Sequence, residues 1–434
     1  MIDTFQSLTH SDHVDRNSLF FHRDFRRLWV SDTTSQFGTF VGQTVLPILA
    51  ATTLAATPFE MGLLTAAETA AFLLIGLPAG VWVDRMRRRQ LMVRADITRA
   101  ALLFSVPIAW WAGWLTLTQL IVAGLLIGVC TVFFDIAYQS YLPSLISRER
   151  LVEGKSKLQA TQSVAQVAGP GIGGLLAQLA GAANAALVTG VGFVTSALFL
   201  WRIKTVEPEP IPHQNPRLWP QIAEGLRFVF GNKNLRAIVG STATANFAGG
   251  AFTAVQVLFL IHDVGLPPAA VGIMMTASGA GGVLAAVVSG PLTRRIGQAR
   301  AVWLIPLVTW PAALLVPFAA PGWRIGLAVL GPLTYSFGGI VYNIAQVSYR
   351  QAICPDRLLG RMNASVRFVV WGTIPLGGLT GGLLGEWLGL RGTIWAACSL
   401  MSVAALWVVC SPLRHLRDIP MHQEAAPDHQ ASSS

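Results

Sequence analysis

Charged side chains are scarce in this sequence. Asp, Glu, Lys and Arg make up 12% of the 434 residues, whereas hydrophobic residues make up 53%. Soluble domains carry about 25% charged residues, so a chain of this composition could not cover its surface in water. Lipid can cover such a surface. The composition therefore excludes an ordinary soluble fold and predicts an integral membrane protein that crosses the bilayer several times.

Cysteine is scarce as well. The sequence has four cysteines and no Gly-X-Y period, which excludes disulfide-rich secreted proteins and collagen-like fibres. Cys130, Cys398 and Cys410 fall in predicted helices and Cys354 in a basic loop, so we expect no structural disulfide. The first 24 residues are polar and have no apolar core, so we expect no signal peptide there.

The side-chain clusters that a membrane enzyme or an ATP-driven pump requires are also missing. The eight histidines lie in tails, loops or span ends, so no metal site is expected inside the membrane. Gly154-Lys155-Ser156 matches the end of a phosphate-binding loop, but Glu149 stands where that loop needs a glycine. We therefore expect no cofactor, no metal and no enzymatic activity.

Long apolar runs are what the sequence has in abundance. A helix needs about 20 apolar residues to cross a hydrocarbon core of about 30 Å, because no backbone polar group can stay unpaired in lipid. Twelve runs are long enough, so we expect an all-α membrane protein. The expected spans are 28–50, 61–83, 91–112, 117–140, 158–181, 184–202, 236–261, 269–292, 300–319, 324–347, 362–386 and 390–411.

The basic residues predict how these spans are oriented. The formal net charge is +10, but the basic residues lie between apolar runs, which marks membrane topology rather than a nucleic-acid surface. If the N-terminus is cytoplasmic, only Arg324 and Arg391 of the 31 Lys and Arg residues face outside. We therefore expect a multi-pass protein of the cell membrane, with both termini in the cytoplasm and no nucleic-acid partner.

A proline-rich break divides the spans into six and six. Every second residue of 207–212 is a proline, which predicts an extended linker. The amphipathic stretch 217–230 that follows predicts a helix on the inner leaflet. The expected parts are a cytoplasmic tail 1–24, a bundle 25–202, a linker 203–235, a bundle 236–412 and a partly disordered tail 413–434.

The two bundles look like copies of one another. A shift of 210 residues places Pro58 on Pro268, Gly62 on Gly272 and Gly80 on Gly290, and a slightly smaller shift places 173–176 on 381–384. Six spans return the chain to its starting side, so both copies have the same orientation. Two parallel, pseudo-symmetric six-helix bundles define a transporter architecture with its site between the halves.

Residues 80–89, Gly-Val-Trp-Val-Asp-Arg-Met-Arg-Arg-Arg, close the second span and resemble the signature loop of the major facilitator superfamily. A weaker copy at 290–297 lacks the Asp, and Arg87 replaces a glycine in the first copy. The resemblance implies a cytoplasmic latch between the halves, with Gly80 allowing close helix approach. An ordinary basic loop would explain the arginines alone. The latch candidates are Gly80, Asp84, Arg85, Arg88, Arg89, Gly290 and Arg294.

A second motif bears on the direction of transport. The run 169–174, Gly-Pro-Gly-Ile-Gly-Gly, resembles the glycine-proline motif of the superfamily's antiporters, although general small-residue packing is the alternative. Residues 133–143 and 35–38 resemble the drug-efflux branch that includes macrolide exporters and the enterobactin exporter. The resemblance implies an exporter that acts as a monomer. The helix-bending candidates are Gly169, Pro170, Gly171, Gly173 and Gly174.

Acidic residues at membrane depth are candidates for proton coupling, because each costs about 2.5–3.5 kcal/mol to insert. Asp32 shares a helix face with Gln36 and Gln43, Glu68 lies in the outer half of the second span, and Asp135 lies near the inner end of the fourth. Asp135 could instead pair with a loop arginine. An apolar surrounding raises a carboxyl pKa towards neutrality, which allows proton loading and release.

Amides and phenols on the cavity-facing spans predict the substrate site. The candidates are Gln36, Gln43, Gln139, Gln162, Asn246, Gln256, Tyr335, Tyr342, Asn343 and Gln346. Such an apolar cavity suits an amphiphilic organic molecule. Asp96 and Arg99, three residues apart, are expected to form a structural ion pair. Arg367, in the eleventh span, is expected to snorkel or to support the latch.

Together these features predict a secondary active exporter that exchanges protons for hydrophobic or amphiphilic compounds. Its partners would be the bilayer, protons and a small-molecule substrate. A dedicated siderophore or metabolite exporter is the main alternative. An importer, a channel and a non-transporting membrane scaffold also remain open.

Overall fold

The computed structural model describes Leu19, residues 22–205, Glu207 and residues 218–418. Every regular element in this part of the chain is a helix. The N-terminal group comprises α1 (Arg23–Thr52), α2 (Pro58–Asp84), α3 (Arg88–Trp111), α4 (Leu117–Leu145), α5 (Leu151–Ala180) and α6 (Ala182–Trp201).

The C-terminal group follows the linker and is more interrupted. A π-helical turn (Phe259–Asp263) extends α8, and a 3-10 segment (Trp310–Phe318) extends α10. The helices after the linker are α7 (Leu218–Gly231), α8 (Lys233–Leu258), α9 (Pro268–Ile296), α10 (Gln298–Thr309), α11 (Ile325–Ile353), α12 (Asp356–Val403) and α13 (Leu406–Val409).

Local sequence explains where several helices begin and turn. The Thr57 hydroxyl accepts from the Glu60 backbone N–H, and the Glu60 carboxylate accepts from Thr57 N–H at 2.8 Å, so a capping box starts α2. Gly181 separates α5 from α6 with φ of +82°, a conformation that a residue without Cβ adopts at no steric cost. A single residue therefore reverses the chain between these two helices.

Eight stretches of the described residues are long and apolar enough to cross a membrane. One of them, Leu358–Val409, contains the expected span 362–386 and all but the last two residues of 390–411, and its backbone breaks at Gly389 with φ of 72°. The helices α1, α3 and α5 are not among the eight. The shortest of these, α3, has 24 residues and is about 36 Å long at 1.5 Å per residue.

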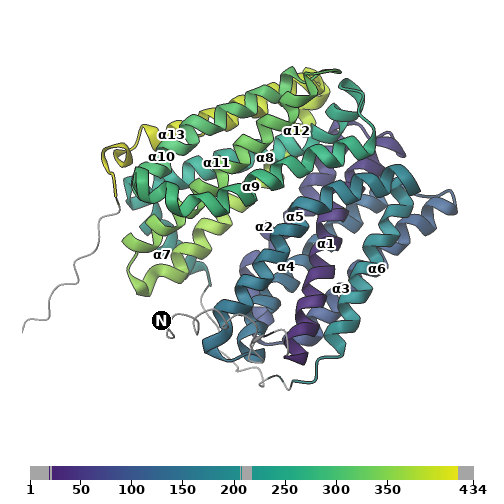
Figure 1. Ribbon diagram of the computed structural model, residues 1–434, viewed down its shortest axis with the longest axis horizontal. Helices are drawn as coiled ribbons and strands as arrows, with labels where there is room; N and C mark the ends of the chain where they lie inside the picture. Colours follow the sequence, from purple (N-terminus) through teal and green to yellow (C-terminus); the bar gives the residue numbers. More distant parts are fainter. Residues whose placement is uncertain (1–18, 20–21, 206, 208–217, 419–434) are drawn as a thin grey trace, which may run out of the picture.

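Figure 1 shows the two groups of helices side by side, converging at one end of the molecule and splaying at the other. The starts of α2 and α9 meet the other group at the converging end, through Gly62 and Gly272, so the far ends of these helices lie at the splayed end. Arg85–Arg89 and Arg294–Arg295 are at those far ends, and we call the splayed end the arginine-rich end. The opposite end is the arginine-poor end. Between the groups α2 packs on α12 and α5 packs on α9. These two helix pairs form the most extensive contacts between the groups.

The amphipathic helix expected in the linker is present as α7, and part of its apolar face packs on protein. It packs on α12 and α8, with Val229 buried beside Met362. Glu224 forms an ion pair with Arg361, and a Cβ on Gly225 would meet the Arg361 carbonyl oxygen at 2.5 Å. The helix expected on the inner leaflet is thus docked on the C-terminal group of helices.

Candidate functional site

A cavity of about 490 Å³ lies between the two groups of helices. Its wall includes Gln43 of α1, Glu68 of α2, Asn246 of α8 and Tyr335 of α11, together with apolar side chains and threonines. A second lobe of about 460 Å³ includes Gln256 and shares Gln43 and Tyr335 with the first. The two lobes together form one central site contributed by both groups.

Four of the ten polar residues expected at the substrate site line the two lobes, namely Gln43, Asn246, Gln256 and Tyr335. Gln36 donates to Asp32, and Gln162 accepts from Gln159. Tyr342 is buried and donates to the Ile238 carbonyl oxygen at 3.1 Å. The expected candidates that line neither lobe are Gln36, Gln139, Gln162, Tyr342, Asn343 and Gln346.

The threonines and aromatic rings that line the site were not predicted from the sequence. Thr69 and Thr253 line the cavity, and each donates its hydroxyl to a carbonyl oxygen four residues earlier in its own helix. Threonines do this throughout helices, so nothing in the sequence distinguishes those at a cavity. Phe72 and Phe193 give no signal either, because apolar residues are abundant in every span.

Glu68 is the only acidic side chain among the residues that line the two lobes, which also include no Lys, Arg or His within the described chain. A Cβ added to Gly124 would lie 3.1 Å from the Glu68 Cγ, and a Cβ added to Gly128 would lie 2.5 Å from the Glu68 carbonyl oxygen. Two glycines one turn apart on α4 thus make room for Glu68. Its carboxylate forms no hydrogen bond or ion pair with the described residues.

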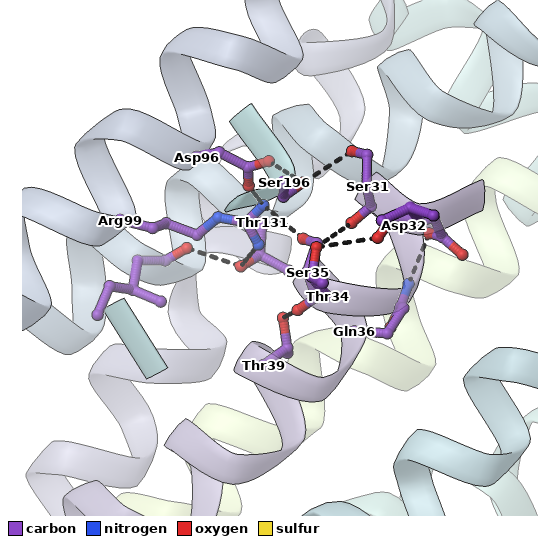
Figure 2. Close-up of polar contacts among 12 residues, drawn as sticks. Ser31, Asp32, Thr34, Ser35, Gln36, Thr39, Asp96, Arg99, Thr131 and Ser196 are labelled. Atoms are coloured by element: carbon purple, nitrogen blue, oxygen red, sulfur yellow. Dashed lines mark hydrogen bonds and ion pairs between the residues drawn. The ribbon is translucent and has the colours of Figure 1, made fainter. Parts of the chain in front are cut away.

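The ion pair expected between Asp96 and Arg99 is present and fully buried behind the cavity wall (Figure 2). Ser196 donates to Asp96, and Arg99 donates to Ser35 at 3.1 Å. The Arg99 guanidinium also lies 4.3 Å from the ring centroid of Phe193, a residue of the cavity wall. The pair therefore joins α1, α3 and α6 directly beside the site.

Asp32 lies at the edge of the same polar network (Figure 2). It is 1% exposed, and its described hydrogen bond comes from the Gln36 amide at 3.4 Å. Asp32 does not line either cavity lobe. Asp135 lies in a separate pocket of about 180 Å³ that also contains Gln139 and Arg367. The three acidic candidates thus occupy three different environments.

Two arginines of the signature loop contact their own group of helices in this conformation. Arg88 donates to the Ser140 carbonyl oxygen at 3.2 Å, and Arg89 donates to that of Ile203. At Gly80 and Gly290 no atom lies within 4 Å of where a Cβ would stand. The close helix approach expected at Gly80 is therefore absent here, because the groups splay at this end. The Asp84 side chain lies outside the described residues.

The glycine-proline motif of α5 contacts helices on both of its sides. Cβ atoms on Gly169 and Gly173 would collide with α1, at Phe40 and Val41. A Cβ on Gly171 would lie 3.0 Å from the Thr276 hydroxyl of α9, and one on Gly174 would be 2.8 Å from Gly272 Cα. The motif thus packs α5 within its own group and also against the other group.

The arginine-poor end is closed by two equivalent contacts. Gly174 meets Gly272 of α9, and Gly382 of α12 meets Gly62 of α2. Beside each, a side chain accepts from the N-terminus of a helix of the other group. The Gln178 amide oxygen accepts from Ala269 N–H and the Glu386 carboxylate from Phe59 N–H, both at 3.1 Å. The repeat observed in the sequence therefore forms the same closure twice.

A closed arginine-poor end, a splayed opposite end and a cavity between two repeated helix groups are features of a membrane transporter. The family model described as "Transmembrane secretion effector" matches residues 18–431. The chain belongs to this family of major facilitator superfamily transporters, with low identity to its drug-efflux members.

Named relatives agree with this assignment. The multidrug efflux pump Tap of Mycolicibacterium fortuitum is 26% identical over 375 residues, which cover 83% of this chain and 89% of that protein. The uncharacterised MFS-type transporter YfiS of Bacillus subtilis is 23% identical, over 88% of this chain and 92% of that protein.

Solved structures share the fold. A bacterial homologue of the human lysosomal transporter Spinster, in an inward-facing and occupied conformation, superposes with a TM-score of 0.70 at 16% identity, covering 91% of this chain and 97% of that chain. A mutant form of the nucleoside transporter NupG gives a TM-score of 0.73 at 15% identity, covering 89% of this chain and 99% of that chain. Identities this low support the fold alone.

Proposed function

We propose that this transporter is a proton-coupled exporter of hydrophobic or amphiphilic small molecules. The observation that carries the proposal is the central cavity, which is walled by both groups of helices and closed at the arginine-poor end by two equivalent contacts. Rocking the groups about this site would expose it alternately to the two sides of the membrane. The efflux function of the relative Tap agrees with the proposed direction.

We further propose twelve spans, with the arginine-rich end in the cytoplasm. The helices α1, α3 and α5 would cross with their polar faces turned inward, and Gly389 would divide the last two spans. Positive residues remain on the cytoplasmic side of membrane proteins, which supports this orientation. On this basis the splayed end opens to the cytoplasm, and the structure is the inward-facing state.

The charge of the cavity wall favours neutral or cationic amphiphiles over an anionic siderophore. Glu68 lies in a wall whose described residues include no basic side chain, so an anion would find no counter-charge there. Aromatic rings such as Phe72 and Phe193 add apolar contacts and can face a cation. A metabolite exporter of the same charge preference is the alternative that fits this wall.

Proton coupling requires a carboxylate that loads and releases a proton during each cycle. Glu68, Asp32 and Asp135 are the candidates, and only Glu68 faces the cavity. A proton on Glu68 would remove the negative charge that a cationic substrate needs. Competition between proton and substrate for one carboxylate would then produce exchange.

Proteoliposomes provide the test. Proteoliposomes that contain the purified protein should accumulate a cationic amphiphilic dye when a proton gradient is applied. Glu68→Gln should reduce the rate of dye accumulation at least tenfold, because the lone charge of the cavity is lost. Asp32→Asn removes a carboxylate that does not line the cavity, and it should reduce the rate less than Glu68→Gln does. Accumulation that survives a collapsed gradient would refute proton coupling. Preference for an anionic analogue of the same dye would refute the proposed substrate class.

A further inference from the structure

A second charged pocket lies between the groups of helices, next to the central cavity. It has a volume of about 180 Å³ and is formed by α2 and α4 of one group and α12 of the other. Phe72 belongs to both this pocket and the cavity, and its ring meets Trp371 of α12 edge-on at 4.7 Å. This aromatic pair lies between the central cavity and the pocket, and the pocket is on the side nearer the arginine-rich end.

Asp135 and Arg367 are the two oppositely charged residues of the pocket, one from each group of helices. Within the described chain they form no hydrogen bond or ion pair, although their charges attract one another. The Arg367 guanidinium instead lies 4.9 Å from the Trp371 ring centroid. Arg367 therefore stands near Asp135 but is not bound to it.

The other charged groups that face Asp135 belong to its own group of helices. Arg99 of α3 attracts Asp135 but is engaged by Asp96 and Ser35. Asp32 of α1 and Tyr138 of α4 also face Asp135. These residues would move with Asp135 if the groups rock. Arg367 is thus the facing charge whose distance from Asp135 would change between access states.

We propose that Asp135 and Arg367 form an ion pair when the arginine-rich end closes, and that this pair couples the protonation of Asp135 to the direction in which the transporter is open. This inference rests on the proposed exporter function. Closing the splayed end would bring α4 and α12 together there, and the two side chains would need to cover only the width of a small pocket. Arg367 would be a coupling residue that does not need to touch the substrate.

The sign of the effect agrees with exchange of protons for substrate. An ionised Asp135 attracts Arg367 and favours the state closed at the arginine-rich end, which releases substrate outward. A proton on Asp135 removes the attraction and favours the return to the splayed state. The proton would leave Asp135 on the cytoplasmic side before the next closure. Asp135 would then carry a proton inward as substrate moves outward, in addition to the proton exchanged at Glu68.

Distances measured by electron paramagnetic resonance in nanodiscs can test the pair without substrate. Spin labels would be attached to Ser147→Cys and Gln351→Cys, which are exposed at the arginine-rich end, after the four native cysteines are replaced. The fraction closed at this end should rise with pH. Arg367→Gln should reduce that fraction about fivefold or more at high pH, and Asp135→Asn should abolish the pH response.

Two further variants make the outcome specific. Arg361→Gln removes the same charge from α12 at a residue that pairs with Glu224 of α7, and it should leave the pH response intact. Arg367→Lys should retain the response because it keeps the charge. A response that persists in Asp135→Asn, or that is lost equally in Arg361→Gln, would overturn the proposal.

The same experiment distinguishes this inference from the proposed function. If the pH response depends on both residues but no compound is exported, the ion pair is supported and the exporter function fails. If proton-driven export is found but neither variant changes the closed fraction, the exporter function is supported and the coupling pair fails.

Discussion

Single residues in this transporter are placed by the space that their neighbours leave. Glu68 reaches the cavity because Gly124 and Gly128 of α4 have no side chains to displace it. Helix packing in membranes depends on such small residues, because lipid provides little hydrophobic force to bring helices together. The site of the cavity carboxylate is thus determined by a helix other than its own.

Gly128→Ala should separate α2 from α4 and displace Glu68, because the new Cβ would be 2.5 Å from the Glu68 carbonyl oxygen. We expect a loss of about 1–3 kcal/mol in stability, typical of overpacking, and a fall in dye export. Thermal unfolding in detergent and the proteoliposome assay would measure both. Gly326→Ala, at a glycine with open space around it, is the control and should not lower the unfolding temperature.

The buried pair Asp96–Arg99 makes a prediction about stability. Asp96→Asn leaves the Arg99 charge buried without its counter-ion, at a cost of about 3–5 kcal/mol, so the unfolding temperature should fall sharply. The double change Asp96→Leu with Arg99→Met should recover much of the loss. Arg27→Gln, which breaks a partly exposed pair with Asp24, should change stability by about 1 kcal/mol or less. Equal effects of the three variants would contradict this account.

The sequence predicted the Asp96–Arg99 pair because residues three apart on a helix share a face. It could not tell which neighbour a helix face would meet. Gln43 and Tyr342 were expected in the same cavity, yet Gln43 lines both lobes and Tyr342 bonds to the Ile238 carbonyl oxygen away from them. To predict which of these two residues lines the cavity, one must know how several helices pack together. The periodicity of a single helix does not contain that information.

Helices of the two groups meet end to side at the arginine-poor end. Glu386 and Gln178 each accept from a backbone N–H at the start of a helix in the other group, where the helix dipole favours negative charge. The first pair involves a carboxylate and the second an amide. The two equivalent closures therefore differ in charge, and Glu386 should contribute more than Gln178.

Removing these acceptors should loosen the closed end. We expect Glu386→Ala and Gln178→Ala to cost the closed state about 0.5–2 kcal/mol each, as for other helix caps, and their effects should add because the sites are separate. Labelling of Thr253→Cys in the cavity by a thiol reagent applied from the arginine-poor side would report the opening. Glu60→Ala removes a neighbouring acid that caps only its own helix, so it should leave labelling unchanged. Equal labelling in all three variants would show that these contacts do not hold the end closed.

The linker helix shows where sequence patterns are ambiguous. The apolar face of α7 fits an inner leaflet as well as it fits a protein surface, and only Gly225 at the contact with Arg361 and Ser365 distinguishes the two. Gly225→Leu should therefore detach α7 from α12, and hydrogen exchange in residues 218–231 should speed up at least tenfold. Gly231→Leu, where no atom lies near, should not change exchange there beyond its own end of the helix.

At the scale of the whole molecule, the repeat in the sequence corresponds to a repeat in the contacts. The shift of 210 residues relates Phe59 to Ala269 and Gly62 to Gly272, and the shift of 208 relates Gln178 to Glu386. The fold family could thus be inferred from the sequence. The access state of the structure could not be inferred from the sequence. A transporter of this kind must contain the residues that close each end in turn, and periodicity does not say which of the two ends is closed.

Locking the arginine-poor end tests whether the two groups move as bodies. Gln178→Cys with Ala269→Cys, in a background without the native cysteines, should be joined by a short reducible thiol cross-linker because these residues are in contact across the groups. We expect export to fall at least tenfold after cross-linking and to return on reduction, since the site could no longer open outward. The matched control joins Ser105→Cys to Gln119→Cys, which lie at the same end but within one group.

Export that continues through the first cross-link would mean that substrate leaves without separation of the groups, as in a channel. Export that stops with both would mean that flexibility within the N-terminal group, rather than rocking between groups, limits transport.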